Sequence, residues 1–398
     1  MTQFTQADVL TKLPKQFFAS LVQKVNYLIA SGADVINLGQ GNPDLPTPHH
    51  IVQAMQEATA KSEHHRYPPF RGHRFLKEAV ANFYAREYGV ELDPDREVAI
   101  LFGGKVGLVE ISQCYLNPDD VALVPDPGYP DYWSGIAMAQ AKMVRMPLLE
   151  QNQFLPDFTQ ISDEEWNQAK LMFLNYPNNP TAGIATTSFF EETVARAREH
   201  QVLVVHDFAY GAIGFDEQKP ISFLQTPGSK NVGIEVYTLS KTYNMAGWRI
   251  AFAVGNEQVI ESINLIQDHF YVSIFGAVQE AAAVALNHSQ ECVDELVEVY
   301  ESRRNTFISR LQELGVENIH APKGSFFCWF PTPSGLGSQE FADLLLEQEH
   351  VAVAPGIGFG QSGDGYIRVG LLTTEERLIE AAERMARCYQ RMKNRLTP

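Results

Sequence analysis

Cysteine, basic residues and long apolar runs are all scarce in this sequence of 398 residues. Its 4 cysteines lie far apart and form no C-x-x-C pair, so nothing indicates a zinc cage or a disulfide framework. Lys and Arg number 31 against 48 Asp and Glu, and the net charge of −17 argues against nucleic acid or an anionic membrane as the main partner. No apolar run is long enough to cross a bilayer, and the first residues lack the apolar core of a signal peptide. We therefore expect a cytoplasmic protein with neither a nucleic-acid nor a membrane partner.

What the sequence does contain is a regular alternation of helical stretches and short apolar runs. Turn-forming residues bound each of the apolar runs. Alternation of this kind is typical of an α/β fold in which helices cover both faces of a mostly parallel sheet. The expected strands of this sheet are residues 98–102, 121–124, 171–174, 202–205 and 236–239.

The two ends of the chain follow a different pattern. A helix over 13–30 and a strand over 35–38 are expected at the start, and a long helical region is expected over 280–309. The remainder reads as an α+β unit with strands at 326–330, 351–354 and 366–369 and a closing helix at 374–395. We therefore predict a segment 1–48 that joins a small domain, a large domain over 49–290, and a C-terminal small domain over 291–398.

Polar and aromatic residues follow the ends of the expected strands. In open α/β sheets, ligands bind outside the carboxyl ends of the strands. If the strands are parallel neighbours, one crevice collects these residues. They are Gly103, Tyr129, Asn179, Asp207, Tyr210 and Lys241.

The chemistry of this set suits a phosphorylated aldehyde cofactor. The helix that opens after Gly103 offers free backbone N–H groups and a positive dipole end to a phosphate. A buried carboxylate at Asp207 could keep a pyridine nitrogen protonated, and the ring of Tyr129 could stack on the pyridine face. Lys241 could condense with the aldehyde and then move a proton as a base. Arg249 could add a forked cation to the phosphate site.

Each of these residues, taken alone, has a simpler explanation. A lone lysine such as Lys241 is usually a surface charge, and Asp207 could be a helix cap. Asn179 between prolines could be a turn former. The adjacent histidines His64 and His65 point apart on any regular element, so we interpret them as surface residues and expect no metal site.

The ordered combination of motifs is more specific than its parts. Asn178-Asn-Pro-Thr181 is followed by His206-Asp-x-x-Tyr210, then by Ser240-Lys-x5-Gly-x-Arg249, and finally by Gly365-Tyr-Ile-Arg-Val369. This series resembles the class I and II aminotransferases of fold-type I, which use pyridoxal 5′-phosphate (PLP). The resemblance runs nearly end to end, from Gly39 to Arg368.

The resemblance implies a role for each matching residue. Lys241 is similar to the lysine that forms the Schiff base with PLP, and Asp207 to the partner of the pyridine nitrogen. Tyr210 and Asn179 resemble the pair that binds the phenolic oxygen, and Tyr129 the ring that stacks on the cofactor. Matches to the family's phosphate-binding positions are Gly104, Lys105, Thr238, Ser240 and Arg249.

The resemblance also implies a substrate site and a partner. Arg368 is similar to the arginine that binds the substrate α-carboxylate, with Gly41 and Asn179 beside it. Tyr67 matches a tyrosine that reaches the phosphate of a neighbouring subunit, which implies a homodimer with shared active sites. One departure is that Ala182 displaces the usual glycine to Gly183, which puts the turn after Asn179 in doubt.

The implied reaction is a ping-pong transfer of an amino group between an L-amino acid and a 2-oxo acid. Residues 266–280, where a second substrate-binding arginine is expected in aspartate-type members, contain neither Arg nor Lys. Phe17, Phe18, Tyr271 and Phe275 are apolar candidates for a side-chain pocket, which favours a neutral substrate such as methionine. The segments 14–22 and 171–180 also resemble methionine-salvage aminotransferases, which act on 4-methylthio-2-oxobutanoate.

Several alternatives stay open on the sequence alone. An aspartate or LL-diaminopimelate aminotransferase would share the motifs, and a PLP-dependent C–S lyase would share the fold and the lysine. The same fold also serves as a ligand-sensing module beside a DNA-binding domain. We do not favour that alternative, since the sequence shows no basic helix-turn-helix segment.

Overall fold

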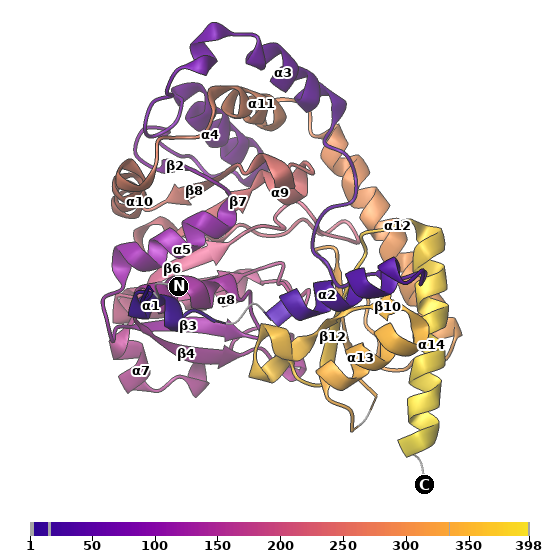
Figure 1. Cartoon of the computed structure of the whole chain (residues 1–398). Coiled ribbons are helices and arrows are strands. Elements are labelled where there is room, and N and C mark those ends of the chain that lie inside the picture. The colour runs from indigo at the N-terminus through magenta and orange to yellow at the C-terminus, as the bar shows by residue number, and fades with distance from the viewer. Residues whose placement is uncertain (1–3, 15–16, 334, 397–398) are drawn as a thin grey trace.

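A computed structural model describes residues 4–14, 17–333 and 335–396 (Figure 1). Its large sheet has the strand order β2-β8-β7-β6-β5-β3-β4. All neighbouring strands pair in parallel except β8, which is antiparallel to both β7 and β2. The mostly parallel α/β sheet is thereby confirmed. The strands are β2 (Val98–Leu101), β3 (Val121–Asp126), β4 (Lys142–Pro147), β5 (Ala169–Asn175), β6 (Leu203–Asp207), β7 (Gly233–Thr238) and β8 (Ala251–Gly255).

Alternating strand residues enter two separate cores, one on each face of the sheet. In β2, Val98 and Ile100 belong to one core, whereas Ala99 and Leu101 belong to the other. Helices therefore have to cover both faces, and they do. The first core receives α3 (His49–Thr59), α4 (Arg74–Tyr88), α8 (Thr187–His200) and α11 (Gly276–Asn287); the second receives α5 (Gly104–Tyr115), α6 (Asp131–Met138) and α10 (Glu257–Phe270).

The two ends of the chain meet in a smaller α+β unit. Figure 1 shows the indigo α2 (Phe17–Ala30) beside the orange and yellow C-terminal elements, where it packs on Leu346 and Ala352. The unit pairs an N-terminal with a C-terminal strand and adds a three-stranded antiparallel sheet. The domain boundaries given above stay a prediction. The elements of the unit are β1 (Ile36–Asn37), α12 (Glu291–Glu313), β9 (Phe327–Pro331), α13 (Ser338–Glu349), β10 (Val351–Ala352), β11 (Ala354–Pro355), β12 (Tyr366–Gly370) and α14 (Glu375–Leu396).

Local expectations differ from the structure in several places, and the expected strand over 351–354 is divided between β10 and β11. The expected helix over 13–30 begins at Phe17, and residues 15 and 16 lie outside the described part. The expected helical region over 280–309 is divided between α11 and α12. The strands β4 and β8 were not expected, because β4 is an exposed edge strand with lysine and arginine in it, and β8 directly follows the motif around Arg249. The link from β7 to β8 contains only the single turn Leu239–Thr242 and the 3₁₀ turn Ala246–Trp248 in place of a crossover helix, and β8 runs antiparallel to β7.

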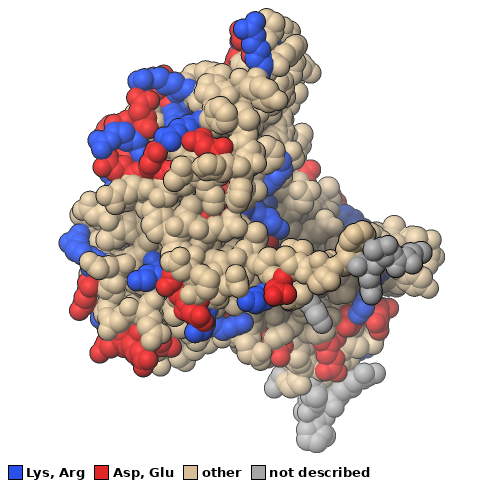
Figure 2. Space-filling model, turned by 60° about the vertical axis from the view of Figure 1, so that its left-hand side comes forward, with Lys and Arg blue, Asp and Glu red and all other residues tan. Residues whose placement is uncertain are grey.

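Charged residues of both signs are mixed on the face shown in Figure 2, without a large area of one sign. Among the described residues, no helix combines the length and the apolar character that crossing a membrane requires.

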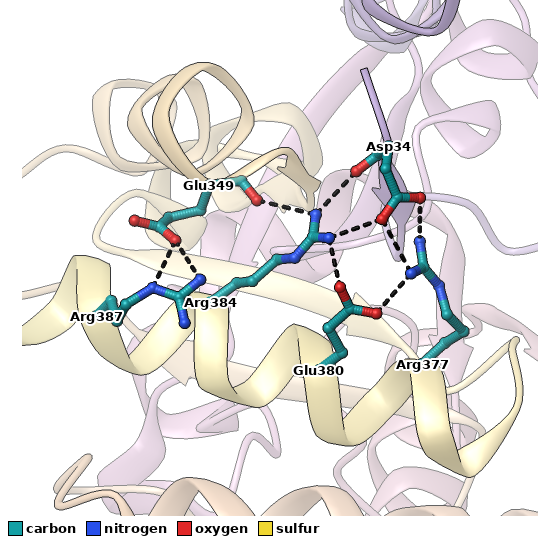
Figure 3. Close-up of polar contacts among 6 residues, drawn as sticks. All are labelled: Asp34, Glu349, Arg377, Glu380, Arg384 and Arg387. Atoms are coloured by element: carbon teal, nitrogen blue, oxygen red, sulfur yellow. Dashed lines mark hydrogen bonds and ion pairs between the residues drawn. The ribbon is translucent and has the colours of Figure 1, made fainter. Parts of the chain in front are cut away.

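An ion-pair cluster on α14 fastens the N-terminal segment to the C-terminal helix (Figure 3). Arg377 and Arg384 each place a guanidinium nitrogen 2.7 Å from a carboxylate oxygen of Asp34, which lies two residues before β1. Glu380 accepts hydrogen bonds from both arginines, and Arg387 pairs with Glu349 at the end of α13. Hydrogen bonds from the two arginines lower the pKa of Asp34 to about 2. We call these residues, together with Arg391, the α14 cluster.

Candidate active site

A cavity of about 670 Å³ lies where the large sheet, the small unit and α2 meet. Figure 2 shows the molecule hollowed between its upper part and the part at the right, with Lys or Arg atoms in the wall. The structure brings every residue to which the resemblance assigned a catalytic, cofactor-binding or carboxylate-binding role into the lining of this cavity except Tyr67. That residue is 89% exposed and lies elsewhere on the surface. The lining includes Gly41, Gly104, Lys105, Tyr129, Asn179, Asp207, Tyr210, Thr238, Ser240, Lys241, Arg249 and Arg368.

Lys241 lies on α9 (Leu239–Thr242), the single turn that directly follows β7. Its Nζ donates a hydrogen bond to the carbonyl oxygen of Gly41 at 2.7 Å and lies 5.6 Å from the ring centroid of Phe326. Burial, together with the charges of Arg368 and Arg249, lowers the pKa of Lys241 to about 8. A fraction of the amine is therefore neutral near pH 8, which is the form that attacks a carbonyl or accepts a proton.

Asp207 ends β6 and presents a buried carboxylate to the cavity. Its Oδ2 accepts a hydrogen bond from Tyr132 Oη at 2.8 Å, and its carbonyl oxygen accepts one from Asn175 Nδ2 at 2.7 Å. Burial raises the pKa of Asp207 to about 6. A cation next to this carboxylate would restore its charged form, which fits a protonated ring nitrogen. The sequence reasoning missed Tyr132, whose ring stacks on Phe173 at 4.9 Å.

The N-terminus of α5 forms a phosphate-sized cradle with three side chains. No side chain caps this helix, whose Ncap residue Gly103 has φ 86°. Arg249, also left-handed with φ 56°, places its guanidinium so close that a Cβ at position 103 would collide with it. Thr238 donates to Ser240 Oγ at 2.9 Å beside this helix end. Uncapped N–H groups, hydroxyls and a guanidinium form a donor set that fits a phosphate.

Lys105 also lies at this helix end, but its ammonium is engaged elsewhere. Its Nζ forms an ion pair with Asp131 at 2.9 Å, and the side chain is half exposed. The backbone N–H of Lys105, in the first turn of α5, has no intrahelical acceptor by its position. The backbone rather than the side chain of Lys105 therefore fits the phosphate cradle.

Arg368 on β12 is a buried guanidinium with neutral partners. Phe327 and Phe359 pack against it, with ring centroids 4.0 and 4.7 Å from Cζ. Nη1 donates to Asn179 Oδ1 at 2.8 Å and Nη2 to the carbonyl oxygen of Gly39 at 3.0 Å. Among the described residues Nε has no hydrogen-bond partner, and burial lowers the pKa of Arg368 to about 10. A buried cation with an unused donor fits an incoming carboxylate.

The turn after Asn179 accommodates the displaced glycine. Asn178 Oδ1 accepts hydrogen bonds from the backbone N–H and the hydroxyl of Thr181 at 3.1 and 2.8 Å. Ala182 adopts a left-handed conformation with φ 58°, and the Asn178 N–H reaches the carbonyl oxygen of Gly183 at 2.8 Å. The extra residue is thus absorbed within the turn, and Asn179 keeps its place beside Arg368.

A second buried polar group that the sequence reasoning missed lies on the far face of the sheet. His206 Nδ1 and Tyr84 Oη both lie 2.7 Å from carboxylate oxygens of Glu235, which is fully buried on β7. This contact joins β6 to β7 next to Asp207 and Lys241. The acidic residue inside the apolar run of β7 was the available signal.

Two of the minor expectations require correction. His64, expected at the surface, is buried, and its Nε2 lies 2.7 Å from Glu280 Oε2, because its segment folds against α11. Of the four apolar candidates for the side-chain pocket, only Phe18 lines the cavity. Tyr271 instead donates to Glu110 at 2.7 Å, and Phe17 and Phe275 are 38% and 41% exposed.

Comparison with known proteins agrees with the geometry of the site. The profile of the family described as aminotransferase class I and II matches residues 33–385. An L-glutamine–4-(methylsulfanyl)-2-oxobutanoate aminotransferase of Bacillus subtilis (strain 168) is 63% identical over 385 residues, covering 97% of this chain and 96% of the relative. An LL-diaminopimelate aminotransferase of Desulforudis audaxviator (strain MP104C) is 42% identical over 389 residues, with 98% and 99% covered.

A solved structure gives the same result for the fold. The substrate-bound structure of BacF from Bacillus subtilis superimposes with a TM-score of 0.93 at 48% identity and covers 98% of both chains. The family match spans most of the chain and includes both the large sheet and the small unit. The chain therefore belongs to the class I and II aminotransferases and is a PLP-dependent aminotransferase of fold-type I.

Proposed function

We propose that the protein transfers an amino group from an L-amino acid such as glutamine to 4-methylthio-2-oxobutanoate, which yields methionine. The observation that carries this proposal is the 63% identity to a relative named for that reaction, over 97% of this chain. The resemblance of segments 14–22 and 171–180 to methionine-salvage aminotransferases supports the same substrate.

The wall of the cavity supports a neutral, apolar substrate side chain. Phe18, Leu21 and Val22 of α2 line the cavity that also contains Arg368, and Phe359 closes this wall. An unbranched thioether side chain is apolar and adapts its shape to such a wall. Two further charged residues of the lining, Lys105 and Asp131, are paired with each other, so neither offers an unpaired charge to a substrate side chain.

The proposed roles follow from position and charge. Bound PLP supplies the electron sink that stabilises negative charge at the substrate α-carbon. Lys241 would take the proton from the α-carbon of the amino acid on Nζ and pass it to the carbon that carries the cofactor's aldehyde, and it would move a proton in the opposite direction when the 2-oxo acid is converted; its lowered pKa favours both moves. Asp207 holds the ring nitrogen of the cofactor protonated, and Arg368 binds the α-carboxylate of both substrates. Asn179 connects the two functions, because it contacts Arg368 and faces the cofactor site.

The remaining residues hold the cofactor. We propose that Tyr210 donates to its phenolic oxygen together with Asn179, and that Tyr129 stacks on its ring. The phosphate is bound by Gly104, Lys105, Thr238, Ser240 and Arg249.

We further propose a cytoplasmic homodimer in which Tyr67 reaches the phosphate of the partner's site. The support is that Tyr67 is 89% exposed and that Phe70 and Phe270 are exposed apolar residues, each at 57%. Apolar side chains left in water at this level favour burial against another surface. Sedimentation of the holoenzyme at micromolar concentration tests the dimer, and Tyr67→Phe tests the shared phosphate contact through a weaker retention of PLP.

The substrate is tested with single-turnover reactions of the PLP-loaded enzyme. Loss of the visible absorbance of the lysine-bound cofactor is followed after methionine, glutamine, aspartate or LL-diaminopimelate is added separately. Rapid reaction with methionine and glutamine is expected. Faster reaction with LL-diaminopimelate would favour the second candidate, which the 42% identical relative supports. A preference for aspartate, or release of pyruvate and ammonia from cystathionine, would replace the proposal by an aspartate aminotransferase or a C–S lyase.

A further inference from the structure

Asp126 is a buried carboxylate for which the proposed chemistry has no use. It ends β3 of the large sheet and is only 2% exposed. Its Oδ2 accepts a hydrogen bond from Arg145 Nη1 at 3.0 Å, while its Oδ1 accepts one from the backbone N–H of Ser362 at 3.0 Å. A buried carboxylate is retained at low energy only when its oxygens are paired in this way.

The partner Ser362 belongs to the small unit, so this contact crosses between the two parts of the chain. It lies in the short turn Gln361–Gly363, which follows the turn Gly356–Phe359. The backbone N–H of Gly128 also donates to the carbonyl oxygen of Phe359 at 2.8 Å. Gly360 has φ 137°, and a Cβ there would collide with the carboxylate of Asp126. The glycine-rich loop 356–363 is thus seated closely on the end of β3.

The loop seated in this way carries one of the two aromatic rings that hold Arg368. The ring centroid of Phe359 lies 4.7 Å from Arg368 Cζ and 5.0 Å from the ring of Phe18. The opposing ring, Phe327, belongs to β9, within the sheet of the small unit. Any shift of the loop relative to the sheet of the small unit therefore moves one wall of the guanidinium site but not the other.

We propose that Asp126 is a positioning residue for substrate binding. By fixing loop 356–363 to the large sheet, it keeps Phe359 against Arg368 and thereby sets the affinity for the substrate carboxylate. The inference rests on the proposed role of Arg368 as the carboxylate-binding residue. Small displacements of a binding group change binding and rate strongly, so the effect of losing this anchor is measurable.

The test uses hexanoate, which has a carboxylate and an apolar tail but no amino group, as a competitive inhibitor of the PLP-loaded enzyme. Asp126→Ala is expected to raise its inhibition constant roughly 10-fold and to change kcat by less than about 2-fold. Phe359→Leu is expected to act in the same direction. If both residues act through one contact, the double variant binds hexanoate no more weakly than the more affected single variant.

A control variant and a milder variant of Asp126 make the outcome specific. Glu349→Ala removes a buried carboxylate that pairs with Arg387 and Arg391, all within the small unit and, among the described residues, without a bond to loop 356–363, and should leave the inhibition constant within about 2-fold. A rise as large as that of Asp126→Ala would mean general loosening and would overturn the inference, as would full additivity in the double variant. If Asp126→Ala does not fold, Asp126→Asn retains an acceptor for Ser362 and should give a smaller rise of about 3-fold.

Arg368→Gln separates this inference from the proposal on which it depends. If that variant binds hexanoate normally, the proposed role of Arg368 is wrong and the role of Asp126 falls with it. If Arg368→Gln weakens hexanoate binding while Asp126→Ala and Phe359→Leu do not, only the inference about Asp126 is overturned.

Discussion

The cavity and the α14 cluster differ in how their charged side chains are paired. In the cavity, Asp207, Lys241 and Arg368 have mainly neutral hydrogen-bond partners, and burial moves each pKa toward the uncharged form. In the α14 cluster, every carboxylate is matched by two arginines, and the pKa of Asp34 is lowered to about 2. Matched charges stabilise a structure, whereas unmatched charges are ready for a ligand that brings the missing partner.

This difference explains why the two sites can have similar composition and different consequences. An unmatched buried charge destabilises the fold until cofactor or substrate arrives, which is a common property of active sites. A matched surface pair adds little to stability individually, and more when several pairs form a network. Substitutions in the cavity should therefore change catalysis first, and substitutions in the α14 cluster should change stability first.

The largest expected effect is that of Lys241→Ala. Removing the base and the covalent attachment point should lower turnover by roughly 10⁴-fold, because positioned proton transfer alone contributes 10²–10⁴-fold. PLP should still bind through its phosphate contacts, but without the visible absorbance of the lysine-bound cofactor. Single-turnover absorbance with methionine is the measurement, and near-normal turnover of the variant would contradict the assignment of Lys241.

Arg368→Gln is expected to have the next largest effect. Loss of a charged carboxylate partner removes about 1.5–3 kcal/mol of binding, so KM for the amino acid should rise roughly 10- to 150-fold. Arg384→Gln in the α14 cluster is the matched control and should leave KM unchanged, since Arg384 binds Asp34 and Glu380 rather than a ligand. Equal effects of the two substitutions on KM would remove the distinction between the sites.

Glu349→Ala, in the α14 cluster, is expected to lower stability rather than to change catalysis. The side chain is only 5% exposed and pairs with Arg387 and Arg391, at 2.9 Å for Arg387. Breaking a pair of this kind should lower the free energy of unfolding by about 2 kcal/mol, less than for a fully buried pair since both arginines reach solvent. Urea unfolding measures the change, and Asp343→Ala, an exposed partner of Lys24, should cost under about 0.5 kcal/mol. A large loss of kcat in Glu349→Ala would contradict the comparison.

The sequence was sufficient to predict the strands that position the cavity and most of its lining. Asp207 ends β6 and Lys241 follows β7, so the residues after parallel strands could be expected at one edge. The motifs then gave a chemical role to residues to which composition alone assigns none. Gly104 and Arg249 also line the same cavity, as expected. Gly104 begins α5 after β2, and Arg249 lies just before β8, the strand that pairs with β2.

The parts that were missed depend on contacts between residues far apart in the chain. Tyr132 reaches Asp207 over 75 positions, and Phe359 reaches Arg368 through the folding of the small unit. The arginines of α14 recur on one helix face and are visible in the sequence, but Asp34 lies 343 positions before Arg377. The role predicted for Tyr67 requires a second copy of the chain, so it stays a prediction.

The smallest expected effect is a difference in pH dependence between Asp207 and Asp34, measured on the cofactor-free enzyme. The pKa of Asp207 is raised from 3.8 to about 6, so the folded chain binds more protons than the unfolded chain between these values. Stability relative to Asp207→Asn should therefore fall, on the order of 1 kcal/mol, as pH rises from about 4 to about 6. The pKa of Asp34 is lowered from 3.8 to about 2, so its contribution is present above 3.8 and is lost only as pH falls toward 2. Stability relative to Asp34→Asn should thus stay constant over the same interval. Thermal unfolding at pH 4.5, 5.5 and 6.5 compares the two variants with the parent; parallel curves for Asp207→Asn and the parent would mean that its carboxylate is as well matched as that of Asp34.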